Sequence, residues 1–316
     1  MAVYTEVSDA ELEAFLAEYD IGSPVAFKGI AEGVENTNYV LTTDRGQYMV
    51  TLYEKRVDPH DLPFFLGLMD HLAARGINCP RPIHARDGNA LRRLAGKLAA
   101  VTSFLQGMWP RRMTVHHCSA VGEALAGFHL AGRDFALERP NALSVAGWRP
   151  LFESSRRHIA PALDRELSSE LEFFEVNWPT ALPAGVIHAD LFNDNVFFLH
   201  ERLSGIIDFY FACNDFLSYD VAICLNAWCF EPDNAFNTTK ARALLQAYDK
   251  VRPLGEDERR AMPILARGSA LRFMLTRLYD WVHTPPDALV KRKDPNEYLA
   301  KLRFHRSAGS LADYGL

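Results

Sequence analysis

The sequence predicts an α+β fold in two parts, a small β-rich part at residues 1–106 and a larger, mostly helical part at residues 107–316. Three observations support this prediction. Short runs of β-branched and aromatic residues, separated by turn residues, fill much of the first third of the chain. Apolar residues at helical spacing dominate after Gly107. Within the helical part, a short β-rich stretch at residues 185–208 carries polar side chains at its strand ends.

The first part begins with a helix and continues as a hairpin. Ser8 and Glu11 form a capping box that predicts a helix over residues 9–19. Two β-rich runs, at residues 38–42 and 48–53, are joined by a turn that contains Asp and Gly. A further helix and a strand complete this part, at residues 59–75 and 97–105.

The second part consists mainly of helices, with proline residues marking several of the breaks between them. We expect helices at residues 115–130, between 150 and 175, and at 217–229, 238–250, 256–282 and 295–307.

Composition and charge argue against several classes of protein. The 316 residues carry a net charge of −6, so the chain lacks the basic character expected of a nucleic-acid-binding protein. No apolar stretch reaches the roughly 18 residues that cross a bilayer, and the start of the chain lacks the pattern of a signal peptide. The five cysteines are scattered, so we expect buried, free thiols. We therefore expect a cytoplasmic protein without nucleic-acid or membrane partners.

The densest polar motif lies in the β-rich stretch. An apolar run delivers His188 and Asp190 to the end of a strand, and another strand begins directly after Asn195. A third apolar run ends in a carboxylate, Asp208. Strand ends and the loop between them are therefore expected to present acids and amides to one spot.

These side chains suit phosphoryl transfer. Mg²⁺ binds oxygen ligands from one or two side chains together with phosphates, and the Asn195 amide and Asp208 carboxylate fit that role. A further carboxylate must accept or orient the proton of the acceptor hydroxyl, and Asp190 precedes Asn195 by the offset found in kinase catalytic loops. Each residue taken alone is also compatible with an ordinary turn or helix cap. Their joint pattern favours the catalytic interpretation.

Residues 188–195 and 207–209 together resemble the aminoglycoside phosphotransferase and choline kinase-like families. The resemblance implies a protein-kinase-like bilobal fold that uses ATP and Mg²⁺. It implies that Asp190 is the catalytic base and that Asn195 and Asp208 are magnesium ligands.

Two further residues receive structural roles from the same resemblance. His188 is implied to support the loop, with direct proton transfer as the alternative. Asp220 lies in a Tyr-Asp-Val-Ala segment that is similar to the families, where that Asp buttresses the loop.

We expect the nucleotide-binding residues at two places in the first part. A turn at residues 33–38 leads into the hairpin, and its Gly and Asn residues tolerate backbone angles that aim N–H groups at phosphates. Residues 100–105 resemble the hinge of the families, whose backbone binds adenine. The candidate nucleotide-binding residues are Gly33, Asn36, Thr37, Asn38, Ser103, Phe104 and Leu105.

One departure from kinases concerns Thr51. Kinases usually carry a Lys on this strand, which contacts phosphates and pairs with a Glu on the next helix. Here Thr51 takes that position and the following helix contains Asp61 and Asp70 but no Glu. Both partners of the ion pair are thus missing together. The replacement cation stays open among Lys28, Lys55, Arg56 and Mg²⁺ itself.

Further segments are similar to the kinase-like homoserine kinases, at residues 36–39, 52–56, 62–64, 96–97 and 129–132. The similarity runs from about residue 5 to residue 308, and Thr51 in place of Lys also fits this group. The resemblance implies ATP-dependent phosphorylation of the L-homoserine hydroxyl, which gives O-phosphohomoserine on the way to threonine.

A zwitterionic substrate needs a cation for its carboxylate and an anion or carbonyl for its ammonium group. Arg272 and Asp280 are near one helix face and would frame such a substrate, with a surface ion-pair stripe as the alternative. Further candidates for substrate binding are Asn193, Tyr210 and Trp148, and for the ammonium group Asp194 and Asp215.

Two other functions stay open at this point. The chain is also compatible with a kinase of another small hydroxylated metabolite or of an aminoglycoside. Alternatively, Thr51 fits a kinase-like protein that binds nucleotide without turnover, whereas Asp190, Asn195 and Asp208 argue against a pure binding protein.

Overall fold

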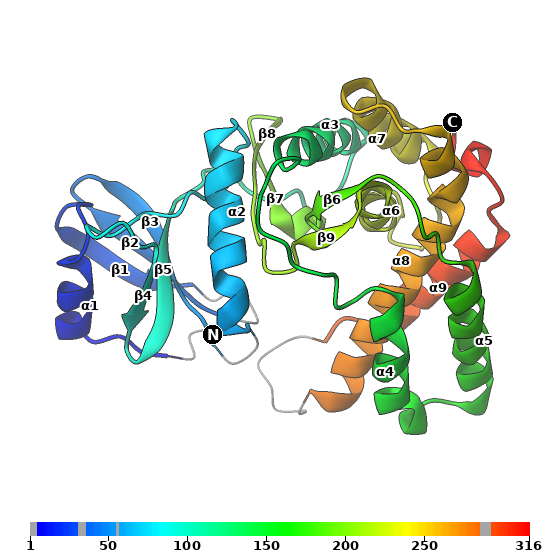
Figure 1. The fold of residues 1–316 in the computed structure, drawn as a ribbon, viewed down its shortest axis with the longest axis horizontal. Coiled ribbons are helices and arrows are strands. Elements are labelled where there is room, and N and C mark those ends of the chain that lie inside the picture. Colours follow the sequence, from blue (N-terminus) through cyan, green and yellow to red (C-terminus); the bar gives the residue numbers. More distant parts are fainter. Residues whose placement is uncertain (1–4, 31–35, 55–56, 285–291) are drawn as a thin grey trace. The chain divides into compact units, whose positions relative to one another are not determined.

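The computed structural model describes residues 5–30, 36–54, 57–284 and 292–316 (Figure 1). The chain divides into two compact units. The first comprises Met1–Gly107 together with two short segments, Phe135–Leu137 and Ser204–Tyr210. The second comprises Met108–Asp134, Glu138–Leu203 and Phe211–Leu316.

The first unit is built on an antiparallel sheet of five strands in the order β1-β2-β3-β5-β4. The strands are β1 (Pro24–Gly29), β2 (Thr37–Thr43), β3 (Gly46–Leu52), β4 (Leu91–Leu94) and β5 (Lys97–Ser103). The predicted hairpin is confirmed, because β2 pairs with β3 in continuous register from Thr37 opposite Leu52 to Thr43 opposite Gly46. The sequence did not indicate β1 or β4.

Two helices lie on opposite sides of this sheet (Figure 1). α1 (Asp9–Leu16) has the predicted capping box, and it buries Leu12 and Phe15 against alternate residues of the strands such as Val50. α2 (Leu62–Ala74) follows a short 3₁₀ turn. Because side chains alternate along a strand, neighbours of the α1-facing residues point to the opposite face of the sheet.

The second unit is mostly helical, with α3 packed along α7, and α6, α4 and α9 packed against α8. Its helices are α3 (Val115–Ala131), α4 (Val145–Ser155), α5 (Pro161–Asn177), α6 (Leu217–Trp228), α7 (Thr238–Val251), α8 (Glu256–His283) and α9 (Pro295–Ser307). The predicted long helix between residues 150 and 175 corresponds to α5, whereas α4 was not predicted. Pro161 starts a separate helix, since proline suits the first turn of a helix and disrupts its interior.

Short strands in the second part position the polar loop. β6 (Ala184–Ile187) pairs with β9 (Cys213–Phe216), and β7 (Val196–Leu199) pairs with β8 (Arg202–Ile206). The predicted α+β class is thus confirmed, with a sheet in the first unit and helices in the second.

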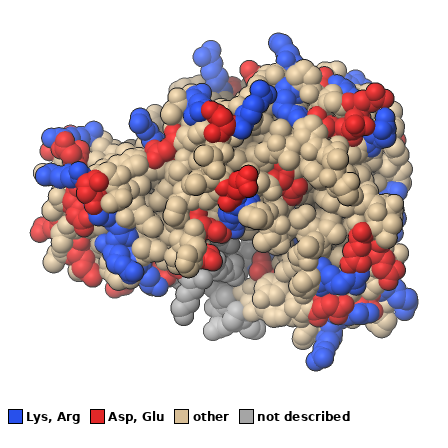
Figure 2. Space-filling view, viewed as in Figure 1, with Lys and Arg blue, Asp and Glu red and all other residues tan. Residues whose placement is uncertain are grey.

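Two expectations about composition meet the structure here. All five cysteines are buried and free, as predicted. No helix in the described ranges is long and apolar enough to span a bilayer. Figure 2 shows acidic and basic side chains interspersed over the face in view, with no broad region of one sign.

Candidate active site

The loop after β6 brings two predicted catalytic residues together. The Asn195 Nδ2 group donates to the Asp190 main-chain oxygen at 2.8 Å and approaches its Oδ2 at 3.3 Å. Asn195 is buried at the end of a 3₁₀ turn that leads into β7. Because both bonds use the amide nitrogen, the Asn195 Oδ1 points away from Asp190 and suits an oxygen-binding cation.

The backbone before Asp190 is held in an unusual conformation. Ala189 has a φ of +63°, in the left-handed region that residues with a Cβ rarely adopt. His188 is fully buried, and its Nδ1 accepts a hydrogen bond from the Asp190 N–H at 3.3 Å. The His188 ring therefore supports the backbone of the loop that carries Asp190.

The Asp220 carboxylate supports the same backbone from α6. Its Oδ2 accepts from the His188 N–H at 2.7 Å and its Oδ1 accepts from the Ala189 N–H at 2.9 Å. The side chain is fully buried. Burial raises the pKa of Asp220, but the hydrogen bonds from the His129 side chain and the His188 main chain outweigh burial and hold the pKa below its usual value. An ionised Asp220 therefore satisfies two consecutive loop amides.

A buried chain of hydrogen bonds leads from α8 to Asp220. His129 Nε2 lies 3.2 Å from Asp220 Oδ2, and His129 Nδ1 lies 2.8 Å from the Tyr248 hydroxyl. Arg252 Nη1 donates to that hydroxyl at 3.1 Å and to Glu258 at 3.0 Å. Burial lowers the pKa of His129, so the ring is neutral. Each hydrogen bond then has a defined donor: Arg252 donates to Tyr248, Tyr248 donates to His129, and His129 donates to Asp220.

Arg272, predicted to bind the substrate carboxylate, contacts the loop that carries Asp190. Its side chain is 1% exposed, and Nη1 donates to the Ala189 main-chain oxygen at 2.6 Å. Its guanidinium lies 4.5 Å from the centre of the Phe273 ring, and its Nε has no hydrogen-bond partner among the described residues. The alternative of a surface ion-pair stripe is therefore wrong for Arg272.

The other predicted substrate residues do not gather around Arg272. Asp280 lies eight residues further along α8, or about 12 Å along the helix axis. The charged groups of an α-amino acid sit on one carbon, so this spacing does not favour framing by the pair. The Asn193 amide donates to the Pro110 main-chain oxygen at 3.1 Å, and the Tyr210 ring packs on Tyr53 and Phe65.

Two weaker candidates are also engaged elsewhere. Trp148 is fully buried and its indole N–H donates to the Leu143 main-chain oxygen at 2.7 Å, so substrate contact is not its role in this structure. Asp215 accepts from the Asn141 amide at 2.7 Å. Burial raises the pKa of Asp215 above its usual value.

Asp208, the second predicted magnesium ligand, belongs to the first unit, whereas Asp190 and Asn195 belong to the second. Asp208 is exposed and has a φ of +64°. The next two side chains anchor its backbone. Phe209 is buried, and the Tyr210 ring packs edge-on against Tyr53 and Phe65, with centroids 5.7 and 5.5 Å apart.

The predicted phosphate turn is described only in part, because Gly33 lies outside the described residues. The Asn36 Oδ1 accepts the Glu54 N–H at 3.2 Å, and the Thr37 hydroxyl donates to the Glu54 carboxylate at 2.9 Å. These side chains therefore tie the end of the turn to the end of β3. Any contact of Thr37 with phosphate would be through its main chain.

The predicted hinge residues differ in how their main chains are used. The Ser103 N–H donates to the Arg81 oxygen at 2.8 Å, and the Phe104 N–H approaches the Gln47 oxygen at 3.4 Å. In the described part of the chain, the Leu105 N–H has no backbone acceptor. Leu105 is therefore the best placed of the three to donate to an adenine.

Thr51, at the usual position of the kinase Lys, donates to Asn38 at 2.8 Å on the sheet face opposite α1. The register of β1 with β2 places Lys28 on the same face as Asn38. Lys97 lies on the α1 face, in an ion pair of 2.8 Å. Residues 55–56 lie outside the described ranges. Of the cations considered from the sequence, Lys28 is thus the described one on the Thr51 face.

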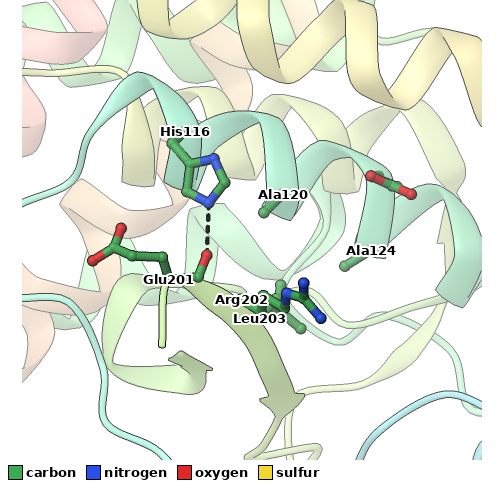
Figure 3. Close-up of a pocket in the computed structure, with 7 residues that line it drawn as sticks. His116, Ala120, Ala124, Glu201, Arg202 and Leu203 are labelled. Atoms are coloured by element: carbon green, nitrogen blue, oxygen red, sulfur yellow. Dashed lines mark hydrogen bonds between the residues drawn. The ribbon is translucent and has the colours of Figure 1, made fainter. Parts of the chain in front are cut away.

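A surface pocket of about 360 Å³ lies elsewhere in the second unit (Figure 3). His116 and Ala120 of α3 form one wall, and Glu201 and Arg202 of the β7–β8 turn form the other. His116 Nε2 lies 2.6 Å from the Glu201 main-chain oxygen. None of the predicted site residues lines this pocket.

Comparison with known proteins identifies the family. The model of the phosphotransferase enzyme family matches residues 26–254, which is well over half of the chain. The chain belongs to the phosphotransferase enzyme family. A protein of Paramagnetospirillum magneticum named homoserine kinase is 63% identical over 325 residues, covering 100% of both chains. A Bradyrhizobium diazoefficiens protein of the same name is 61% identical, covering 100% of this chain and 98% of the relative.

Solved structures show the same fold at low sequence identity. An amicoumacin kinase, solved in complex with AMP-PNP and Ca²⁺, has a TM-score of 0.68 and 14% identity, covering 95% of this chain and 92% of its own. A choline kinase from Cryptosporidium parvum has a TM-score of 0.65 and 14% identity, and the match covers 89% of this chain and 88% of the choline kinase chain. The prediction of a protein-kinase-like fold is thus confirmed.

Sequence reasoning missed the contacts that three residues make with the predicted site segments. His129 was seen only within a segment of family resemblance, and Arg272 was expected at the substrate. Tyr53 was seen only as part of a strand. Arg272 carried a detectable signal, because a charged residue flanked by apolar residues on both sides within a helix predicts burial. For His129 and Tyr53 the partners lie far away in the sequence, so no local signal indicates them.

Proposed function

We propose that this chain is a homoserine kinase, which transfers the γ-phosphoryl group of ATP to the hydroxyl of L-homoserine and gives O-phosphohomoserine. The assignment of the substrate rests on one observation: the chain is 61–63% identical over its full length to relatives named homoserine kinase. The chemistry is supported by the Asp190–Asn195 pair on a rigidly buttressed loop. In this role the chain acts in the cytoplasm, in threonine biosynthesis.

Asp190 is the proposed catalytic base. A carboxylate at this position accepts the proton of the homoserine hydroxyl as the hydroxyl oxygen attacks the γ-phosphorus. The Asn195 amide, bonded to Asp190, fixes the rotamer of this carboxylate. The role of Asp220, His188 and Arg272 is to position Asp190, since each binds the backbone of residues 188–190.

Asn195 and Asp208 are the proposed magnesium ligands. The donor set fits a hard cation, because the Asn195 Oδ1 is directed away from Asp190 and the Asp208 carboxylate is exposed. Bound Mg²⁺ supplies positive charge that neutralises the phosphate oxygens. Among nucleotide contacts, we propose the Leu105 N–H for adenine, with Gly33 and residues 36–38 near the phosphates.

For the substrate, the roles proposed here differ from the first expectation. Arg272 positions the loop through Ala189. Asp280 and Asn193 stay candidate contacts for the charged groups of homoserine. A change of KM for homoserine without a change of KM for ATP in Asp280→Asn would support direct contact, whereas unchanged constants would exclude it.

The proposal is tested by ADP release from Mg-ATP over a panel of L-homoserine, other amino alcohols, choline and aminoglycosides. L-Homoserine should give the highest kcat/KM by a wide margin. Turnover of another alcohol without turnover of L-homoserine would refute the substrate. Nucleotide binding with no turnover of any acceptor would favour the non-catalytic alternative.

A further inference from the structure

Active kinases require both an ion pair and a metal-binding Asp. A Lys on the second hairpin strand pairs with a Glu on the next helix, and both must be in place together with that Asp for activity. In this chain Thr51 replaces the Lys, and α2 contains no Glu. The ion pair that links these two elements in kinases is therefore absent between β3 and α2.

An aromatic cluster occupies this position within the first unit. Tyr53 directly follows β3, Phe65 lies in the first turns of α2, and Tyr210 follows Asp208 by two residues. The Tyr210 ring meets Tyr53 at an interplanar angle of 81° and Phe65 at 89°. Both partners are buried, at 5% and 1% exposure. Edge-to-face geometry of this kind is the favourable arrangement for aromatic pairs.

The hydroxyl groups of the cluster add a weak polar contact. The Tyr210 hydroxyl donates to the Tyr53 hydroxyl at 3.4 Å, longer than a strong hydrogen bond. Burial raises the pKa of Tyr53 to about 12, and burial also raises the pKa of Tyr210 well above its usual value. Both groups therefore remain protonated at neutral pH. Ring packing, and not charge, accounts for most of the contact.

We propose that Tyr53, Phe65 and Tyr210 form an aromatic clamp that fixes the Asp208 segment to β3 and α2 in place of the kinase ion pair. Tyr210 is then a positioning residue and not a substrate contact. The inference rests on the proposed function only where it takes Asp208 as a metal ligand. It also explains why both ionic partners are absent, since an unpaired buried charge would be costly.

The first test needs neither nucleotide nor metal. Hydrogen exchange by mass spectrometry is compared between wild type and Tyr210→Ala for the peptide that covers residues 204–210. Loss of two ring contacts should speed exchange there by about tenfold or more. Phe135→Ala is the matched control, because Phe135 packs on α2 through Phe64, with ring centroids 5.4 Å apart. Unchanged exchange in Tyr210→Ala, or an equal change in Phe135→Ala, would overturn the clamp.

The second test follows metal binding without turnover. Mn²⁺ is titrated into the ATP-bound protein and detected by electron paramagnetic resonance. Tyr210→Ala should weaken Mn²⁺ binding by about tenfold, while Tyr210→Phe, which keeps the ring, stays within about twofold. Wild-type Mn²⁺ affinity in folded Tyr210→Ala would refute the inference. If that variant does not fold, Phe65→Leu removes the other face of the clamp and should give the same loss.

These results are separable from the proposed substrate. Failure of the wild type to phosphorylate L-homoserine would refute the proposed function but leave exchange and Mn²⁺ binding interpretable. Turnover of homoserine with an unaffected Tyr210→Ala variant would refute the clamp and leave the substrate assignment standing.

Discussion

The two segments that carry the proposed catalytic groups are held in place by different physics. The loop at residues 188–190 is fixed by Asp220 and Arg272, through buried hydrogen bonds of 2.6–2.9 Å to its backbone. The segment at residues 208–210 is fixed by aromatic packing around Tyr210. One segment depends on charge and the other on apolar contact.

This difference follows from what each segment has to do. A general base must present its carboxylate within a narrow range of positions, and directional hydrogen bonds provide such control. The Asp208 segment instead places an exposed carboxylate directly before buried rings, so ring packing restricts its backbone. The comparison predicts that the loop at residues 188–190 is sensitive to charge and pH, whereas the segment at residues 208–210 is sensitive to side-chain volume.

The largest effect is expected for Asp190→Asn. Removing the base should lower kcat by about a thousandfold, within the usual range for general base catalysis. Nucleotide affinity should remain near wild type, as measured by equilibrium binding of ATP. Asp257→Asn, a change at an exposed acid outside this loop, is the control and should keep most activity. A large loss of ATP affinity in Asp190→Asn would indicate a metal role instead.

A smaller but still large effect is expected for Asp220→Ala. Two loop amides and His129 lose their acceptor, which should cost about 3 kcal/mol in the free energy of unfolding. Urea denaturation measures this loss, and kcat should fall with it. Asp257→Asn, an exposed acid in the first turn of α8, should change stability by less than about 0.5 kcal/mol. Equal stability of the two variants would contradict the buttressing role.

Stability should depend on pH differently in the two segments. His129 is buried with its pKa lowered by burial, so the unfolded chain takes up a proton near pH 6.5 that the folded chain does not. Stability therefore falls as pH drops through about 6.5, and exchange at residues 188–195 should increase more than at residues 204–210 after correction for intrinsic rates.

The control for this pH effect is His129→Gln. Burial also lowers the pKa of His305, to about 3, which acts in the same direction elsewhere in the second unit. The contribution of His129 is therefore the difference in pH slope between wild type and His129→Gln. A slope that does not change in the variant would show that folding does not lower the pKa of His129.

The smallest effect is expected for Lys97→Met. Lys97 pairs with Glu54 on the α1 face of the sheet, and its side chain is partly exposed. The change should reduce stability by about 0–1 kcal/mol and leave the KM for ATP unchanged. Lys28→Met should raise that KM, because Lys28 lies on the Thr51 face. A raised KM in Lys97→Met alone would reverse the assignment of the two faces.

Local patterns were enough to predict the fold class, the hairpin and most helices. They were also enough to single out Asp190 and Asn195, because the two lie close in sequence within one loop. Arg272 shows where such reasoning ends, since its loop contact depends on packing between α8 and a loop far away in the chain. The aromatic clamp is non-local in the same way, because Tyr53 and Tyr210 are 157 residues apart.

Secondary-structure errors had more local causes. The strands β1 and β4 were missed because both are short and neither shows a clear alternation of apolar and polar residues. α4 was missed because it contains Pro150 in its interior, and proline normally marks a break in a helix.

The central claim is phosphoryl transfer to L-homoserine by the loop that carries Asp190. The most direct measurement is ³¹P NMR of a reaction with Mg-ATP and L-homoserine, run with wild type and Asp190→Asn. We predict a phosphomonoester resonance that matches O-phosphohomoserine and grows with ADP in the wild type, and that is about a thousandfold slower in the variant. ADP formation without that resonance, or equal rates in the two proteins, would contradict the account.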